Sequence, residues 1–430
     1  MKHTTTEIRL KNGARGLLID VPGATVMSFQ FQFRAGNRYV KNKDIYETAH
    51  IMEHMAFGAN AAFKSEHAYE AEFTKNGAYH NAFTSDLSMV YVATCADFEW
   101  DRILNLQQVA ICQPKFNASE LEAEKGNVKS ELTGYLNNHE RVLWPKIQQL
   151  LGESVYTYWQ RLQTISNVTL RDIREHHRRT HTTDNMRFVI AGKLYGRKAQ
   201  IQRMLEEWEL PRGERFEVPR DELTSGNPTL IRRKEASNLT FGWSLTLPRA
   251  LTDEEAEAMS CLDQILTGTM HSRIYGAARK KGLAYGMFSD TSVGLHDSSW
   301  DFGGQVNLET SHGLVDIIVR EVKAVMDGRI TDEELAAAKS YALGRHQMGA
   351  QTVSQISNFY SNRYFGDEVV KDYEKVPDAI RNITLDRMLA TAREFIAHNT
   401  WVLAGVSSGE KEEIVSLNAK LETVFSRAPH

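Results

Sequence analysis

The sequence predicts an α+β fold made of two homologous α/β-sandwich-like units, each an antiparallel sheet covered by helices. Strand-like and helix-like patterns are mixed along the chain rather than strictly alternating, which favours antiparallel sheets over βαβ units. The order of these patterns in the first half returns in the second half, which indicates an ancient duplication. Between the halves, residues 213–228 lose this periodicity and contain turn-forming proline and glycine. We therefore predict an N-terminal α+β domain over residues 1–212, a linker over residues 213–228, and a homologous C-terminal α+β domain over residues 229–430.

Composition places the chain among globular proteins and excludes several functional classes. The 430 residues exceed one ordinary domain, and 42% apolar with 25% charged residues is typical of folded proteins with buried cores. A net charge of −4 argues against a general nucleic-acid or anionic-membrane binder. No apolar run is long enough to span a bilayer, and the first residues lack the apolar core of a secretory signal. The three cysteines form no Cys-x-x-Cys pair, so we expect neither disulfides nor a cysteine metal site, and a cytoplasmic protein.

The first half is predicted to open with strands and continue with helices. Phe29, Phe31 and Phe33 alternate with other residues, which predicts a strand with one apolar face. Patterns of this kind predict strands over residues 7–20, 25–35, 79–95 and 186–191. Helical periodicity predicts helices over residues 45–57, 97–112, 119–138, 141–151 and 169–180.

The second half repeats this plan. Its predicted strands cover residues 230–233, 240–247 and 300–308, and a further strand begins at Ala284. Its predicted helices cover residues 253–266 and 314–326, and another begins near residue 331. Residues 331–339 are similar to residues 119–125, and this alignment sets Ala338 opposite Glu124 and Arg345 opposite Glu131.

The segment from Glu47 to Phe57 carries the residues with the clearest chemistry. His50 and His54 are four positions apart on a predicted helix, so both imidazoles lie on one face and can bind one metal ion. Glu53 immediately precedes His54 and can reach an open coordination position without being a ligand. The order His-x-x-Glu-His is the inverzincin motif.

Two histidines leave a catalytic zinc one protein ligand short, because such sites usually have three protein ligands and a water. The helix predicted over residues 119–138 offers four carboxylates, namely Glu120, Glu122, Glu124 and Glu131. Glu124 and Glu131 are two helical turns apart and face the same way. Periodicity alone therefore does not choose between them.

With Glu131 as the distant glutamate, the pattern resembles the insulinase/pitrilysin family of zinc peptidases, and the resemblance extends over nearly the whole chain. It implies one Zn²⁺ per chain bound by His50, His54 and Glu131, with Glu53 as the catalytic base and Glu124 supporting the site. It implies a metalloendopeptidase that hydrolyses short or unfolded peptides inside an enclosed chamber. The chain would form half of this clamshell chamber, as a homodimer or as a heterodimer with a related subunit.

Three further segments carry the resemblance on the substrate side. Asn81-Ala82 is similar to the family's strand that aligns the substrate backbone beside the catalytic helix, which implies substrate-binding roles for Asn81 and Ala82. In the second half, Ser272–Tyr275 and Lys281–Tyr285 are similar to a signature that helps to grip substrate.

The second-half signature departs from the family pattern at one position. The family places an arginine seven residues before the tyrosine that corresponds to Tyr285. Here that position is Ala278, and Arg279 is its neighbour. A shift of one residue turns a helical side chain by about 100°, so Arg279 is a candidate substrate-binding residue that points differently.

The second half also supplies a comparison for the metal residues. Ala338 and Arg345 replace the two glutamates, and residues 253–266 contain no histidine. The fold therefore does not require these groups, which favours a functional role for them in the first half. The alternatives are a non-catalytic or partner-dependent subunit of a heterodimeric peptidase of this family, and a zinc hydrolase of non-peptide substrates.

The other histidines that we considered are expected at the surface. His80 lies beside Asn81 on a strand, where we expect it to be solvated. His176, His177 and His181 have helical spacing and basic neighbours, which is typical of a solvated helix face.

Overall fold

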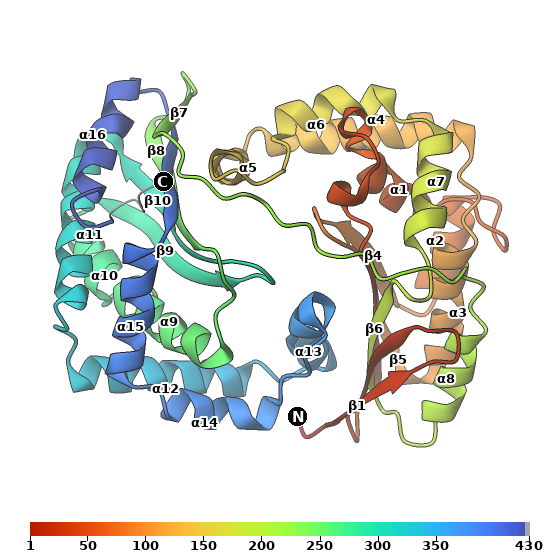
Figure 1. The fold of residues 1–430 in the computed structure, drawn as a ribbon. Coiled ribbons are helices and arrows are strands. Elements are labelled where there is room, and N and C mark those ends of the chain that lie inside the picture. Colours follow the sequence, from red (N-terminus) through yellow and green to blue (C-terminus); the bar gives the residue numbers. More distant parts are fainter. Residues whose placement is uncertain (426–430) are drawn as a thin grey trace. The chain divides into compact units, whose positions relative to one another are not determined.

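The computed structural model describes residues 1–425 as two compact units, each with one β-sheet and several helices (Figure 1). Unit 1 consists of Met1–Gly134, Tyr158–Pro219 and Gly349–Lys371. Unit 2 consists of Tyr135–Thr157, Arg220–Met348 and, among the described residues, 372–425. The predicted α+β class, with sheets covered by helices, is confirmed.

The sheet of unit 1 has six strands in the order β1-β2-β6-β3-β5-β4. Their bounds are β1 (Thr4–Arg9), β2 (Arg15–Asp20), β3 (Val26–Phe33), β4 (Tyr79–Thr84), β5 (Met89–Ala96) and β6 (Met186–Gly192). Neighbouring strands are antiparallel except for the parallel pair β2 and β6. The single strand predicted over residues 79–95 is a hairpin, because a turn in which the Ser85 N–H donates to the Ser88 carbonyl separates β4 from β5. Strand β4 is an edge of this sheet.

Strand β3 forms the centre of unit 1 because both of its faces are buried. Phe29, Phe31 and Phe33 have no exposed surface and occupy one face. On the other face, the Gln30 amide donates to the Ser357 hydroxyl of α13 (Val353–Asp367) at 3.0 Å. The polar residues that alternate with the phenylalanines therefore lie under a helix.

The remaining helices of unit 1 include α1 (Thr48–Ala56), which carries His50, Glu53 and His54. The others are α2 (Glu66–Thr74), α3 (Trp100–Cys112), α4 (Ala118–Tyr135), α6 (Tyr158–Thr164), α7 (Leu170–Thr180) and α8 (Lys198–Glu206). Helices α2, α6 and α8 have nine residues or fewer and were not predicted. Segments of this length carry too few periodic positions to be distinguished from loops.

The sheet of unit 2 has the same plan with five strands, in the order β7-β11-β8-β10-β9. Their bounds are β7 (Thr229–Arg232), β8 (Asn238–Leu247), β9 (Ala284–Val293), β10 (Ser298–Asn307) and β11 (Thr400–Ser407). One neighbouring pair, β11 and β7, is parallel, and the hairpin β9–β10 occupies the edge. This hairpin takes the position that β4–β5 takes in unit 1.

In unit 2, the helix predicted over residues 253–266 is confirmed as α9 (Asp253–Leu266). The others are α5 (His139–Leu150), α10 (Arg273–Lys280), α11 (Ser311–Met326), α12 (Asp332–Met348), α14 (Val376–Arg381), α15 (Leu385–Ala397) and α16 (Lys411–Leu421). Among the helices of residues 1–425, none combines the length and apolar character that crossing a membrane requires.

One helix from each half of the sequence packs in the unit formed mainly by the other half. Helix α5 belongs to unit 2, where Val142, Leu143 and Ile147 pack against Val402 and Ala404 of β11. Helix α13 belongs to unit 1, as Figure 1 shows by the blue helix beside the sheet of that unit. The compact units are therefore not contiguous in sequence. The division into residues 1–212 and 229–430 stays a prediction about the repeated segments.

The expected solvation of three histidines near the end of α7 is wrong. His176 and His181 are buried, and the Nε2 atoms of His176 and His177 lie 2.8 Å from the Ala35 carbonyl and 2.9 Å from the Ile111 carbonyl. These carbonyls replace water as hydrogen-bond partners of the neutral rings. Burial lowers the pKa of His176 and of His177 to about 4.

These buried rings predict a loss of stability in mild acid. A histidine whose folded pKa is about 4 and whose unfolded pKa is near 6.5 binds fewer protons when folded, so its contribution to stability is present above pH 6.5 and declines below it. Between pH 7 and pH 5, we expect the free energy of unfolding to fall by about 2 kcal/mol less in His177→Gln than in the wild type. Urea unfolding of both proteins at the two pH values measures this difference. A stability gap between the two proteins that is independent of pH would contradict the assignment.

Candidate metal centre

Helix α1 presents an apolar side to the core and a polar side to the candidate site. Ile51, Met52 and Met55 are fully buried. His50 and His54 are one turn apart, and their ring centroids lie 5.0 Å from each other. The i, i+4 spacing thus brings the two imidazoles together, as the sequence pattern predicted.

Helix α4 brings Glu131 to the same point. The Glu131 Oε2 atom lies 3.4 Å from the Nε2 of His50 and 3.4 Å from the Nε2 of His54. Two ligand atoms that are each 2.0–2.1 Å from a shared tetrahedral centre lie about 3.4 Å apart. The three side chains therefore fit a zinc ion. Within residues 1–425 they are the group of His, Cys, Asp and Glu side chains that could hold a metal, with ligand atoms all within 4.8 Å of one another.

The three side chains are buried to different degrees. The exposed fraction of the side chain is 9% for His50, 24% for His54 and 31% for Glu131. A bound ion would be shielded on the His50 side and open toward solvent on the side of Glu131. Catalytic zinc sites need such an open position, whereas structural sites are closed by four protein ligands.

Glu124 is not placed as a ligand but holds one of the histidines. Its Oε2 atom lies 3.0 Å from the Nδ1 of His54 and also accepts from the Asn127 amide at 3.1 Å. A carboxylate only accepts, so Nδ1 carries a proton, and Nε2 is the ring atom left to bind an ion. The hydrogen bond from His54 lowers the pKa of Glu124 below its ordinary value.

Glu47 and Arg161 complete the surroundings of His50, and the sequence analysis assigned neither. The Glu47 Oε2 atom lies 2.9 Å from the Nδ1 of His50, and the two nitrogens Nε and Nη2 of Arg161 reach the same carboxylate at 2.5 Å and 3.0 Å. The spacing of three residues between Glu47 and His50 was a usable signal, because such residues share a helix face. No local signal points to Arg161, which lies 114 positions away.

The electrostatics of this group favour positive charge. Burial alone would lower the pKa of His54, but hydrogen bonds with Glu124 and Glu131 outweigh burial and raise it to about 10. Burial alone would raise the pKa of Glu47, yet Arg161 and His50 hold it below its ordinary value. Glu47 and Glu124 therefore stay ionised beside the imidazoles, as expected for residues around a bound cation.

Glu53 lines a cavity beside the three potential ligands. Together with His54 it lines a cavity of 670 Å³ whose other walls come from α2, α4 and β4. Asn81 of the edge strand β4 also lines this cavity, and it is exposed while Ala82 is buried. The Asn81 Oδ1 atom accepts from the Ala82 N–H at 2.9 Å. The structure thus brings Glu53, His54 and Asn81 to one cavity.

The expected solvation of His80 is wrong. Its side chain is 7% exposed, and its Nε2 atom lies 2.7 Å from Glu70 Oε1. Its ring centroid lies 4.6 Å from that of Phe57 and 4.2 Å from that of Phe73. Packing between the aromatic rings, with the carboxylate of Glu70 at one nitrogen, removes this ring from water.

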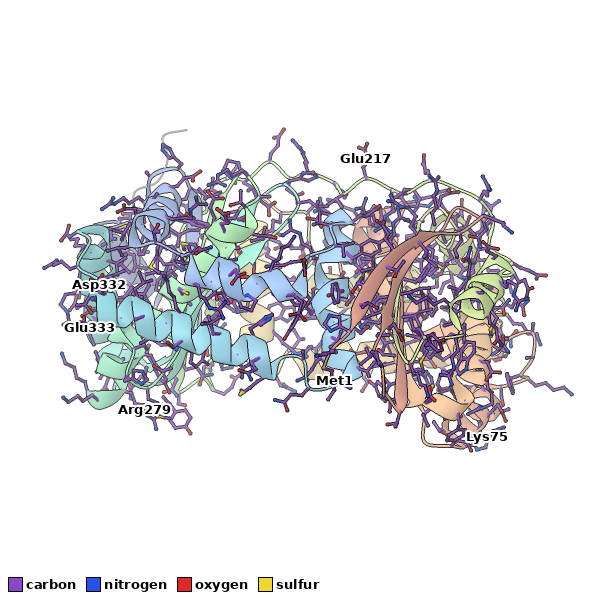
Figure 2. The ribbon with its side chains drawn as sticks, turned by 90° about the horizontal axis from the view of Figure 1, so that it is seen from below. Met1, Lys75, Glu217, Arg279, Asp332 and Glu333 are labelled. Atoms are coloured by element: carbon purple, nitrogen blue, oxygen red, sulfur yellow. The ribbon has the colours of Figure 1, made fainter. Side chains whose placement is uncertain are left out.

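In unit 2, Tyr285 and Arg279 lie together. Pairing between β9 and β10 passes from Gly286↔Gln305 to Ala284↔Val306, so Tyr285 is the extra residue of a β-bulge. Its side chain is 85% exposed, and the guanidinium carbon of Arg279 lies 5.1 Å from the centre of its ring. Figure 2 shows Arg279 at the outside of this unit.

The position of the family's expected arginine is filled differently. Ala278 is fully buried in α10, so an arginine at this position would have to place its charge away from water. Arg279 projects from the next position and donates to the Tyr285 carbonyl at 3.3 Å. The predicted change in direction is therefore seen, and Arg279 still reaches the tyrosine.

Two family models match the chain. The model described as insulinase (peptidase family M16) matches residues 17–151, and the model described as peptidase M16 inactive domain matches residues 167–341. The first match contains the segment with His50, Glu53, His54 and Glu131. The second match ends before α13.

Individual proteins agree with these models. An uncharacterized zinc protease of Streptomyces coelicolor is 23% identical over 91% of this chain and 87% of its own length. The mitochondrial-processing peptidase subunit beta of Caenorhabditis elegans is 30% identical, but over 31% of this chain and 29% of its own length. Its match therefore spans less than a third of that relative.

Solved structures share the whole fold. A peptidase M16 inactive domain from Pseudomonas fluorescens has a TM-score of 0.81 at 17% identity, covering 95% of this chain and 99% of its own. At this identity the likeness shows the fold alone. Taken with the two family models, it confirms the resemblance drawn from the sequence, and the chain belongs to the insulinase family of peptidases, family M16.

Proposed function

We propose that this chain is a zinc metalloendopeptidase that hydrolyses short or unfolded peptides. The observation that carries the proposal is the convergence of His50 Nε2, His54 Nε2 and Glu131 Oε2, with both N···O separations at 3.4 Å. Two imidazoles and one carboxylate form a common ligand set of catalytic zinc. The partial exposure of Glu131 leaves room for water and substrate.

Glu53 is the proposed catalytic base. Bound zinc would polarise the scissile carbonyl and make a water more acidic. Glu53 lines the cavity beside His54, where it would take the proton of the attacking water and return it to the leaving amine. Glu124 would keep His54 oriented through Nδ1 while its Nε2 faces the ion.

The edge strand β4 is the proposed docking site for the peptide. An edge strand has unpaired backbone groups along one side, and an extended peptide can add to it as a further strand. Asn81 and Ala82 lie on this strand, and Asn81 also lines the cavity. Recognition through the backbone predicts broad sequence tolerance. We also propose that Tyr285 and Arg279 contact substrate from unit 2.

The match to an inactive-domain model does not argue against catalysis. That match covers residues 167–341. The proposed ligands and the proposed base all lie within residues 17–151, which match the insulinase model. The zinc protease of Streptomyces coelicolor, similar over 91% of this chain, supports a zinc enzyme. A cytoplasmic location stays a prediction from the sequence.

The second candidate is a subunit that needs a partner for activity. Several relatives are named as subunits of a mitochondrial-processing peptidase, which favours an assembly of this chain with itself or with a related subunit. Peptide cleavage by the purified chain alone would support a homodimer or monomer. Zinc binding without cleavage, followed by cleavage when a related subunit is added, would support the partner-dependent reading.

Replacement of the base should separate metal binding from catalysis. Glu53→Gln removes the proton acceptor but none of the ligands, so we expect about one zinc per chain and a fall in kcat of about 10²–10⁴-fold. Metal analysis and cleavage of a mixed peptide library measure the two properties. Glu122→Gln, at a carboxylate on α4 that is 75% exposed, is the matched control and should retain full activity. Full activity of Glu53→Gln would rule out this residue as the base.

Replacement of the third ligand should weaken the metal itself. Glu131→Gln is expected to reduce zinc affinity by more than the 10–100-fold that loss of an outer hydrogen-bond partner typically causes. Chelator competition gives the affinity, and removal of zinc followed by its return should abolish and restore cleavage. Unchanged zinc affinity in Glu131→Gln would show that another residue is the third ligand.

A further inference from the structure

Both oxygens of the Glu47 carboxylate accept hydrogen bonds from side chains. Its side chain has no exposed surface, and Glu47 is the residue immediately before α1, three positions before His50. One oxygen, Oε1, accepts from Arg161 Nε at 2.5 Å. The other, Oε2, accepts from Arg161 Nη2 at 3.0 Å and from His50 Nδ1 at 2.9 Å. The two-point contact with the guanidinium fixes the plane of the carboxylate.

Backbone contacts hold the same two segments together. The Glu47 N–H donates to the hydroxyl of Thr164 at 3.3 Å, and this hydroxyl donates to the Arg161 carbonyl at 2.9 Å. Helix α6, which carries Arg161, is thereby tied to the start of α1. The position of the Glu47 oxygens relative to His50 is therefore set from both sides.

A buried ion pair is weak evidence for a role in stability, because well-packed apolar residues of similar volume are often as good or better. The Glu47–Arg161 pair is then better explained by the contact of Glu47 Oε2 with the Nδ1 of His50. The acceptor at Nδ1 fixes the proton of the imidazole on that nitrogen and leaves the lone pair on Nε2. That Nε2 faces Glu131 Oε2 at 3.4 Å.

The two histidines are held by different devices. His54 is oriented by Glu124, whose side chain is 14% exposed and whose second partner is the neutral amide of Asn127. His50 is oriented by a fully buried carboxylate paired with a guanidinium. The arginine balances the charge of Glu47, so this carboxylate can lie beside the site without adding net negative charge to it.

We propose that Glu47 and Arg161 are positioning residues that hold His50 in the tautomer and orientation needed to bind the ion. This inference rests on the proposed zinc site. Glu47 acts on the metal through His50, and Arg161 acts through Glu47 and through its Nη2 atom, which lies 3.4 Å from the Nδ1 of His50. A partner of this kind typically changes metal affinity by 10–100-fold.

The competing explanation is that the pair only ties α6 to α1. A matched pair in unit 1 separates the two explanations, because Glu99 and Arg102 form a similarly buried ion pair, with side chains 3% and 22% exposed. The carboxylate of Glu99 is bonded to Asn76 and Arg102, not to a candidate ligand. Its removal changes stability without touching a histidine of the site.

The test compares two double variants of the full chain. Glu47→Gln/Arg161→Met removes both charges but keeps an amide oxygen that can accept from Nδ1. Glu47→Leu/Arg161→Met removes both charges and the acceptor. Zinc affinity is measured by chelator competition, the cobalt-substituted absorption spectrum reports the ligand geometry, and urea unfolding with excess chelator reports stability without metal.

We expect the Leu/Met variant to lose 10–100-fold in zinc affinity and to show an altered cobalt spectrum. The Gln/Met variant should keep most of the affinity at equal metal-free stability. Glu99→Leu/Arg102→Met should keep the wild-type zinc affinity, whether its metal-free stability rises or falls. Arg161→Lys, which preserves the charge but not the two-point contact, supplies a second comparison if the Leu/Met variant does not fold, and it should bind zinc more weakly than wild type.

Three results would overturn the inference. Wild-type affinity in the Leu/Met variant, or in Arg161→Lys where the former does not fold, would mean that the pair is structural. An equal affinity loss in the Glu99 and Arg102 control would show that the effect follows stability alone. Absence of zinc binding by the wild type would overturn this inference and the proposed function together. Zinc binding without peptide cleavage would count against the proposed function only. The comparison of zinc affinities would then still test the role of Glu47 and Arg161.

Discussion

The contact of one Glu131 oxygen with two imidazole nitrogens, each 3.4 Å away, is the constraint on which the site depends. Helical pitch supplies half of it, because His50 and His54 share a face of α1 whatever surrounds them. The other half requires a second helix, α4, at a fixed distance from the first. The burial of Ile51, Met52 and Met55 under α1 and of Val128 and Leu132 along α4 fixes both helices in the core of unit 1. The sheet matters to the chemistry through this anchoring and through its exposed edge β4.

The two units show that the chemistry is added to the fold and is not part of what makes it fold. Unit 2 has the same strand plan and a long helix, α12, in the place of α4. Ala338 is buried there, and Arg345 stands where unit 1 has Glu131. A sheet covered by helices therefore forms with or without ligands. The proposed metal chemistry therefore depends on side chains of unit 1 and not on the fold itself.

The sequence predicted the features that depend on neighbouring residues. It did not predict the features that depend on contacts between residues far apart in the chain. Helix α9 begins at the predicted Asp253, where the structure has a Thr252–Glu255 capping box formed by neighbouring residues. Periodicity could not separate Glu124 from Glu131, since the choice depends on how α1 and α4 approach each other. Arg161 could not be found, because nothing near it in sequence records its contact with Glu47. His176 was placed wrongly, because a buried carbonyl can take the place of water for an imidazole.

The most direct measurement is the position of the metal in a crystal of the zinc-loaded protein, from anomalous diffraction on both sides of the zinc absorption edge. The account predicts one strong peak in unit 1, coordinated by the Nε2 atoms of His50 and His54 and by a carboxylate oxygen of Glu131. Glu124 and Glu47 should then be found at the Nδ1 atoms, outside the coordination shell. No peak at this point, or a peak coordinated through Glu124 in place of Glu131, would contradict the account.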